Sequence, residues 1–209
     1  MGYSTVMGHR EALLEGAKRC LYEKGYARTT ARDIVAASGT NLASIGYHFG
    51  SKEALLNAAL TEAVTEMGQE LLQATSKDMT GPSIEDLSRG WSNAINRLND
   101  FRPLLIAQLE AWAQIERSPE LRSELAALYR AQTENGLEHA KAVAPWLDDR
   151  SARAAVVLTN AIADGLMVQW LLDPDNGPTG EDVALGLAAL TSVVTDDDTT
   201  PRRPRADSE

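Results

Sequence analysis

The sequence predicts an all-α fold of about nine helices. Three observations lead to this prediction: apolar residues recur at a helical period along the chain, no segment alternates between apolar and polar residues as a strand would, and glycine and proline are nearly absent from long stretches. The chain has 209 residues, of which 44% are hydrophobic and 24% are charged. This is the composition of a soluble globular protein, with enough length for one ordinary core or for a small module fused to a larger one.

The first fifty residues predict three short helices. The first covers about residues 9–24 and ends at Gly25, a residue that commonly terminates helices. The second begins after Thr30, whose hydroxyl can cap it, and ends at Gly39. A third covers about residues 41–48. Two short helices separated by a glycine indicate a helix–turn–helix.

The rest of the chain predicts longer helices separated by clear breaks. A fourth helix opens at Ser51, and Thr80-Gly81-Pro82 marks the break after it. Further boundaries are expected at residues 100–103, at Ser118-Pro119, at Pro145 and at residues 173–178, so that the last two helices cover about residues 149–172 and 179–194. The tail, residues 195–209, has almost no apolar content and is expected to be disordered.

Charge is distributed unevenly along the chain. Residues 1–57 carry seven Lys and Arg against five Asp and Glu, a balance of +2, whereas residues 58–209 carry thirteen against twenty-five, a balance of −12. The N-terminal part can therefore approach a polyanion that the rest of the chain would repel.

Several classes of function lack the residues they need. Cys20 is the single cysteine, so a disulfide within the chain and a cysteine-based zinc site are excluded. The three histidines are too few and too dispersed for a catalytic or metal cluster, and no phosphate-binding loop or hydrolase motif occurs. We therefore expect no catalytic residues, no metal and no cofactor, and we expect the protein not to be an enzyme.

A membrane location is not expected either. The first sixteen residues contain no apolar core of a signal peptide. Residues 154–172 are apolar enough to need a check, but Asp164 would cost about 2.5–3.5 kcal/mol in the middle of a span. We interpret this segment as a buried helix and expect a cytoplasmic protein associated with the nucleoid.

The third short helix has a composition suited to the major groove of DNA. A helical wheel places Leu42, Ile45 and Phe49 on one face, which would pack inward. The opposite face carries Thr40, Ala43, Ser44 and Tyr47, with Asn41 and His48 at the flank. This outer face has no acid that would repel phosphates, and its small and hydrogen-bonding side chains can read base edges. Arg28, Thr30 and Lys52 are placed where they can hold the phosphate backbone.

The same residues resemble a known family. The segment GYARTTARDIVAASGTNLASIGYHFGSKEALL is similar to the DNA-binding domain of TetR-type transcriptional regulators, above all in GY-x-x-TT, DIVAASG and YHFGSKEALL. The resemblance implies a homodimeric all-helical repressor whose C-terminal domain binds a small effector and dimerises. Matched by position, it assigns DNA contacts to Thr30, Thr40, Asn41, Ser44, Tyr47, His48 and Lys52.

Two positions depart from the pattern of the family. Gly46 stands where many members have Tyr or another larger residue, and Ala43 stands where many have Gly. Gly46 lies beside the apolar face on the wheel, so we expect it to allow close helix packing. These departures affect the sequence of the operator rather than the DNA-binding role.

These observations together predict three regions. Residues 1–50 form a three-helix helix–turn–helix DNA-binding domain, residues 51–194 form a helical effector-binding and dimerisation domain, and residues 195–209 are the tail. The expected partners are double-stranded operator DNA, a second copy of the chain and an unidentified small-molecule effector. Two other hypotheses stay open: a ligand-binding or enzymatic helical bundle, and a protein-interaction dimer that no longer binds an effector.

The C-terminal half suggests residues for dimerisation and for the effector. The last two helices are apolar almost all round, so one face needs a partner subunit. Glu110, Glu116 and Asp164 interrupt apolar helices and could face a cavity. The predicted dimer contacts are Val157, Ala161, Gly165, Val168, Ala184, Leu187 and Ala188. The predicted effector contacts are Trp91, Phe101, Leu109, Trp112, Glu116, Tyr129 and Asp164.

Overall fold

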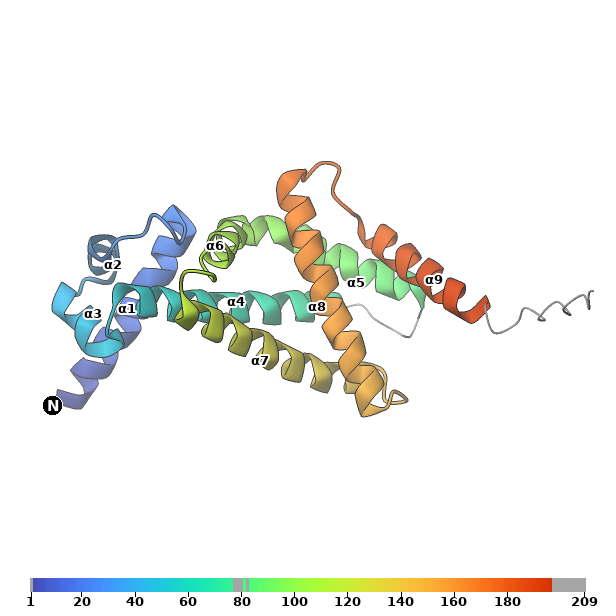
Figure 1. Cartoon of the computed structure of the whole chain (residues 1–209), viewed down its shortest axis with the longest axis horizontal. Helices are drawn as coiled ribbons and strands as arrows, with labels where there is room; N and C mark the ends of the chain where they lie inside the picture. Colours follow the sequence, from blue (N-terminus) through green and yellow to red (C-terminus); the bar gives the residue numbers. More distant parts are fainter. Residues whose placement is uncertain (1, 77–80, 82, 197–209) are drawn as a thin grey trace, which may run out of the picture.

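The computed structural model describes residues 2–76, 81 and 83–196, and within them it contains nine α-helices, one 3-10 helix and no strand (Figure 1). The predicted all-α fold is therefore confirmed. The predicted tail lies outside the described residues from residue 197 onward. The helices are α1 (Gly2–Lys24), α2 (Ala31–Ser38), α3 (Leu42–Phe49), α4 (Lys52–Ser76), α5 (Ile84–Arg97), η1 (Leu98–Phe101), α6 (Arg102–Trp112), α7 (Pro119–Val143), α8 (Asp149–Leu172) and α9 (Gly180–Asp196).

The helices begin where their capping residues predict. Thr30 accepts a hydrogen bond from the backbone of Asp33, and the Asp33 side chain accepts one from the backbone of Thr30, which completes a capping box. Ser83 and Ser118 are the N-caps of α5 and α7, and each side chain accepts a hydrogen bond from the backbone N–H three residues later. Local sequence therefore fixes the ends of these helices.

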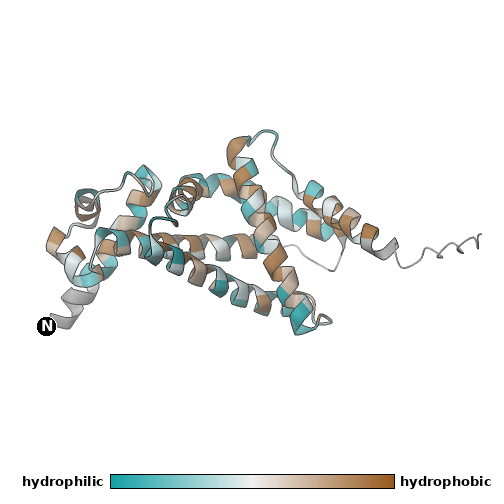
Figure 2. Ribbon diagram, in the orientation of Figure 1, coloured by the Kyte–Doolittle hydropathy of each residue, from teal (hydrophilic) through white to brown (hydrophobic). Residues whose placement is uncertain are grey.

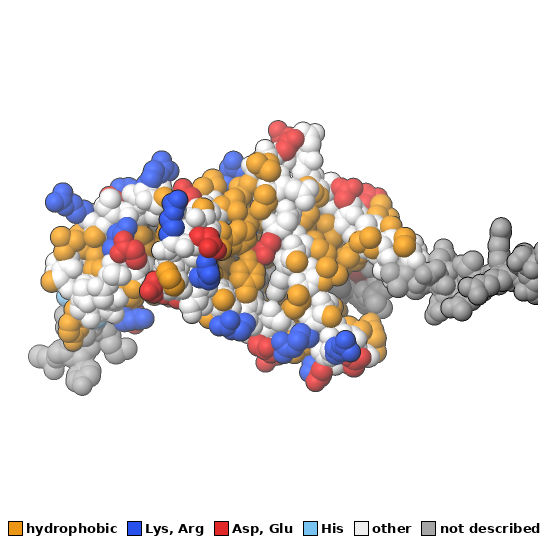
Figure 3. All heavy atoms as spheres, in the orientation of Figure 1, with side chains coloured by type: hydrophobic (Ala, Val, Ile, Leu, Met, Phe, Trp, Pro, Cys, Tyr) orange, Lys and Arg blue, Asp and Glu red, His pale blue; other side chains and the backbone are white. Residues whose placement is uncertain are grey.

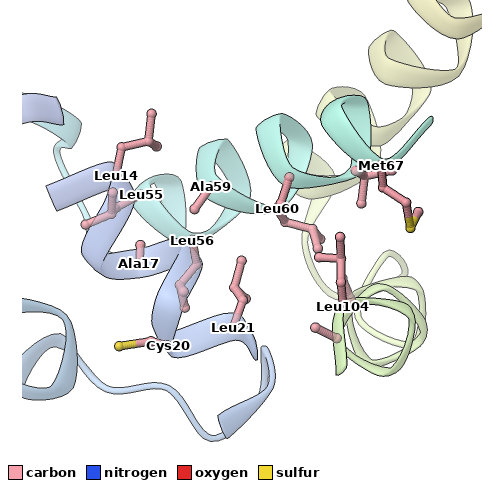
Figure 4. Close-up of a cluster of buried hydrophobic side chains, with 14 of the residues drawn as sticks. Leu14, Ala17, Cys20, Leu21, Leu55, Leu56, Ala59, Leu60, Met67 and Leu104 are labelled. Atoms are coloured by element: carbon pink, nitrogen blue, oxygen red, sulfur yellow. The ribbon is translucent and has the colours of Figure 1, made fainter. Parts of the chain in front are cut away.

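Helix α4 is the central support of the fold. It packs against α1 and α3 at one end and against α5, α6 and α7 along its length (Figure 1). Figure 4 shows how Leu56 and Leu60 of α4 meet Leu21 of α1 and Leu104 of α6 in the main core, which α7 and α8 also enter. Helix α4 thus packs both against N-terminal helices and against C-terminal helices. The predicted boundary at residue 50, between a DNA-binding and an effector-binding domain, therefore stays a prediction.

Helices α5, α8 and α9 form a second, smaller core around Trp91, Leu166 and Val183. Most of α8 is exposed in the single chain, and Figure 2 shows hydrophobic residues along both α8 and α9. The expectation that α8 is a buried helix is therefore wrong for one chain, because only α7 and parts of the two cores cover it. Within the described residues, α8 is also the helix whose length and composition would allow it to cross a membrane.

Candidate nucleic-acid interface

Helices α2 and α3 are joined by a tight turn. Gly39 adopts a left-handed conformation with φ 66°, which favours glycine, and its N–H donates to the carbonyl of Val35. Two residues later, the side chain of Asn41 accepts from the N–H of Ser44 at 3.0 Å and so begins α3. The end of one helix and the start of the next are both satisfied locally, as a helix–turn–helix requires.

Helix α3 packs against α1, α2 and α4 through a narrow face. Ile45 is the buried apolar residue of this face, and Phe49 and His48 are half-buried. The guanidinium of Arg10 in α1 lies over the Phe49 ring, 5.2 Å from its centroid. These contacts fix the rotation of α3 and thereby the side chains that it exposes.

The exposed face of α3 carries Asn41, Leu42, Ala43, Gly46 and Tyr47. Tyr47 is 76% exposed, and its ring stands edge-on to His48 with centroids 4.8 Å apart. Residues 40–50 contain no Asp or Glu, so the exposed face presents no negative charge.

The structure corrects the rotation that the helical wheel suggested. Ser44 was expected on the outer face but is buried, with only 9% exposure, and its hydroxyl donates to the Asn41 side chain. Leu42 was expected to pack inward but is 54% exposed, and a Cβ built on Gly46 would meet nothing within 4 Å. Ile45 and Phe49 suffice to anchor so short a helix, and a serine with a bonded hydroxyl can be buried at little cost.

The predicted phosphate contacts lie around the start of α2. Arg28 is exposed, and its Nε donates to the carbonyl of Lys24 at 3.0 Å. The Thr30 hydroxyl donates to Asp33 at 2.6 Å, and Asp33 forms an ion pair with Lys24. The hydrogen bond from Lys24 and those from Thr30 lower the pKa of Asp33. The chain's own carboxylate thus occupies the anion position that we predicted at Thr30.

Thr40 and Lys52 flank the exposed face of α3. Thr40 is half-buried, and its hydroxyl lies 2.7 Å from that of Ser38. Lys52 stands in the first turn of α4, where its ammonium donates to the carbonyl of Thr29 and lies 3.3 Å from Glu53. About a third of the Lys52 side chain is exposed, so a cation stands at the edge of the face.

The predicted effector residues do not all come together. Tyr129 of α7 donates to Asp164 of α8 at 2.8 Å, and the ring of Trp112 lies 6.5 Å from that of Tyr129. Burial raises the pKa of Asp164, although the hydrogen bond from Tyr129 opposes this shift. Tyr129 and Asp164 line a groove between α7 and α8 together with Thr133, Val157, Asn160 and other residues.

The other predicted effector residues have different surroundings. Trp91 and Phe101 are buried in the two cores, and Leu109 packs against the larger one. Glu116 is exposed and pairs with Arg122 at 2.7 Å, so it faces no cavity. Aromatic residues on amphipathic helices are commonly core residues, and sequence alone does not distinguish the two roles.

The dimer predictions are also corrected in part. Val157, Ala161 and Gly165 are exposed on α8, so their role as dimer contacts stays a prediction. Ala184 is only 1% exposed, because the start of α9 packs tightly on α5, so it cannot contact a second subunit in this conformation. Val168 and Leu187 are half-buried against the two cores, and Ala188 is half-buried as well. The sequence analysis missed the exposed Leu158, Leu172, Leu185, Leu190 and Val193.

A set of hydrogen bonds that the sequence analysis did not identify joins the loop between α1 and α2 to helices α4 and α6. The backbone N–H of Ala27 donates to Glu110 of α6 at 2.9 Å. The Tyr26 hydroxyl donates to Asn57 of α4 at 2.6 Å, and Asn57 is hydrogen-bonded to Glu124 of α7. Glu110 was expected near a cavity, but it reaches the loop before α2. A buried asparagine within the apolar run LLNAAL was the signal in the sequence for this link.

This arrangement of α1, α2 and α3 is a helix–turn–helix domain, the class of fold that places its second helix in the major groove. Comparison with known families agrees. Residues 13–59 match the family described as bacterial regulatory proteins, tetR family, and residues 82–196 match the tetracyclin repressor-like C-terminal domain. The second match covers more than half of the chain. The chain therefore belongs to the TetR family of regulators.

Individual relatives are similar over different lengths. The chain is 30% identical to the transcriptional repressor AcnR of Corynebacterium efficiens over 116 residues, which is 55% of each protein, so it spans about half the length of this relative. It is 25% identical to the transcriptional regulator TtgR of Pseudomonas putida over 178 residues, 80% of this chain and 82% of the relative. The crystal structure of the multidrug binding protein EbrR complexed with imidazole superposes with a TM-score of 0.61 at 25% identity, covering 95% and 98% of the two chains.

Proposed function

We propose that the protein is a dimeric transcriptional repressor that binds operator DNA and is released by a small-molecule effector. The observation that carries this proposal is the exposed face of α3, which is free of acidic residues, projects Tyr47 and belongs to a helix–turn–helix. Its relatives in the family are named as transcriptional repressors and regulators, which are not enzymes. A regulator of transcription would act in the cytoplasm, where operator DNA lies.

The side chains on and around α3 have distinct roles in this proposal. Tyr47 reaches a phosphate or a base edge with its hydroxyl. Asn41 uses its amide oxygen to cap α3, which leaves its NH2 group as a donor toward a base. Arg28 and Lys52 approach the phosphate backbone on either side, where binding releases counterions and makes affinity fall steeply with salt.

A second copy of the chain would cover the exposed apolar residues of α8 and α9. Leu185, Leu190 and Val193 lie on one side of α9, and Val157 and Leu158 are exposed on α8. Lipid is a poor occupant of this surface, because the exposed and charged Arg153 lies one helical turn before Val157 on α8. A two-fold dimer that buried ~800 Å² per subunit would have a standard-sized interface. It would bring two α3 helices to successive major grooves, about 34 Å apart.

The effector would bind between α7 and α8. Tyr129 and Asp164 supply polar groups there, and Trp112 supplies an aromatic neighbour to Tyr129. A half-buried carboxylate favours an effector that is cationic or donates hydrogen bonds. The bound effector would favour a dimer in which the two α3 helices are too far apart or too close for the operator.

The polar link between Glu110 and Ala27 would carry this change to α3. Helix α4 bonds to the loop that precedes α2 through Asn57, and α6 does so through Glu110. Helix α7 is linked to this loop indirectly, through the hydrogen bond between Glu124 and Asn57. A shift of α6 or α7 would therefore displace this loop and the helix–turn–helix behind it.

Binding to the DNA upstream of the gene tests the proposal. Gel-shift titration should show that Tyr47→Ala weakens binding at least tenfold, since the hydrogen bond of the phenol to DNA and the packing of its ring against the DNA are lost. Tyr22→Ala is the matched control, because Tyr22 is also an exposed tyrosine but lies on α1. The proposal fails if a folded Tyr47→Ala protein binds this DNA as tightly as the wild type.

A further inference from the structure

Leu42 is a large apolar side chain that the described residues of the chain leave more than half exposed. It is the first residue of α3 and is 54% exposed. Its sequence neighbours on the exposed face are Asn41 and Ala43, neither of which is large enough to shield it. Gly46 lies one helical turn later on the same face and has no side chain. A Cβ built on it would have no other heavy atom within 4 Å. More than half of Leu42 is therefore available for contact with a partner.

The position of Leu42 decides what it would meet on DNA. The N-terminal residues of a recognition helix are the ones that contact base edges. A leucine donates and accepts no hydrogen bonds, so burying it against a polar base edge would leave that edge without a partner. The alkyl group that thymine presents in the major groove, its C5-methyl, avoids this cost. The missing side chain at Gly46 lets the helix backbone come close enough for the contact.

We propose that Leu42 is a specificity-determining residue that contacts the C5-methyl group of a thymine in each operator half-site. This inference rests on the function proposed above. Tyr47 and Lys52 hold α3 against the DNA, and Leu42 selects the base. The neighbouring Ala43 extends the same apolar contact.

The experiment begins with the purified full chain, which selects its preferred duplex from a random pool. Each thymine of a selected half-site is then replaced by uracil, which removes only the methyl group, and affinity is measured by fluorescence anisotropy. We expect one position at which uracil weakens wild-type binding about fourfold per half-site, the value of one buried methyl group. Leu42→Ala should bind the thymine duplex more weakly and should not distinguish thymine from uracil at that position.

Lys52→Ala is the control variant, because it should lower affinity while keeping the preference for thymine. A wild type that is indifferent to uracil at every position would overturn the assignment, as would a Leu42→Ala protein that keeps the full preference. In both cases a selected operator would still stand, so the proposed function would survive. If no sequence is selected at all, the proposed function fails and the assignment of Leu42 fails with it.

Discussion

Two surfaces are exposed within the described part of the chain, one on α3 and one on α8 and α9, and their chemistry differs. The exposed face of α3 presents small, polar and aromatic groups, with Leu42 as its one large aliphatic side chain. The exposed sides of α8 and α9 present long aliphatic side chains, and Figure 3 shows hydrophobic side chains gathered around α8 and along α9. The first surface suits a hydrated polyanion and the second suits another protein surface. The extent of exposure therefore says little about the partner of a surface, whereas the chemical character of the exposed side chains indicates its class.

A charge placed on the second surface should have the largest effect. Leu190→Glu puts a carboxylate on the exposed side of α9, where a dimer would bury it at a cost of several kcal/mol. We expect sedimentation analysis to show monomers and operator affinity to fall at least 100-fold. Gln69→Glu, which adds the same charge at an exposed position of α4, should change neither. A dimeric Leu190→Glu protein would show that α9 is not the interface.

The next largest effect is expected where Glu110 of α6 contacts the loop before α2, between the two surfaces. Gly25 has φ 82°, and a Cβ there would lie 2.7 Å from the Glu110 carboxylate, so Gly25→Ala should lower the free energy of unfolding by about 1–3 kcal/mol. Gly39→Ala is the matched control, because Gly39 also has a positive φ of 66° but a Cβ there would meet nothing within 4 Å. Urea denaturation of both variants measures the difference. Equal stabilities would mean that the contact with Glu110 yields easily.

On the first surface, stability and binding should change in opposite directions. Gly46→Ala should raise the free energy of unfolding by up to about 1 kcal/mol, since alanine is the better helix former and the space is open. The added methyl group would hold the helix away from the base edges, so operator affinity should fall. Thermal denaturation and anisotropy measure the two effects. Affinity that rises with stability would contradict a close approach at Gly46.

The smallest effect is expected in the groove between α7 and α8. Burial raises the pKa of Asp164, so the folded protein binds a proton there more tightly than the unfolded chain does. The wild type should therefore gain stability relative to Asp164→Asn as the pH falls from neutral through the raised pKa toward the ordinary value of about 3.9. Denaturation at several pH values measures this. A difference that is constant with pH would mean that Asp164 is solvated.

The sequence predicts the helices more reliably than it predicts their contacts. Caps and breaks are local, which is why α8 has the bounds that the sequence indicates and Ser118 begins α7. The rotation of α3 is not local: on the wheel Leu42, Ile45 and Phe49 are equally good anchors, and only the packing against α1, α2 and α4 selects two of them. The burial of Ala184 and the pairing of Glu110 with the loop before α2 depend on helices distant in sequence for the same reason.

The central claim is that a two-fold dimer presents two α3 helices to one DNA site. Hydroxyl-radical footprinting on the selected duplex, combined with the mass of the complex, tests it most directly. We expect two symmetry-related protected half-sites whose centres are separated by about one helical turn or a multiple of it, bound by chains in pairs, and we expect this protection to be lost with Tyr47→Ala. A single protected segment bound by one chain, or protection that survives Tyr47→Ala, would contradict the claim.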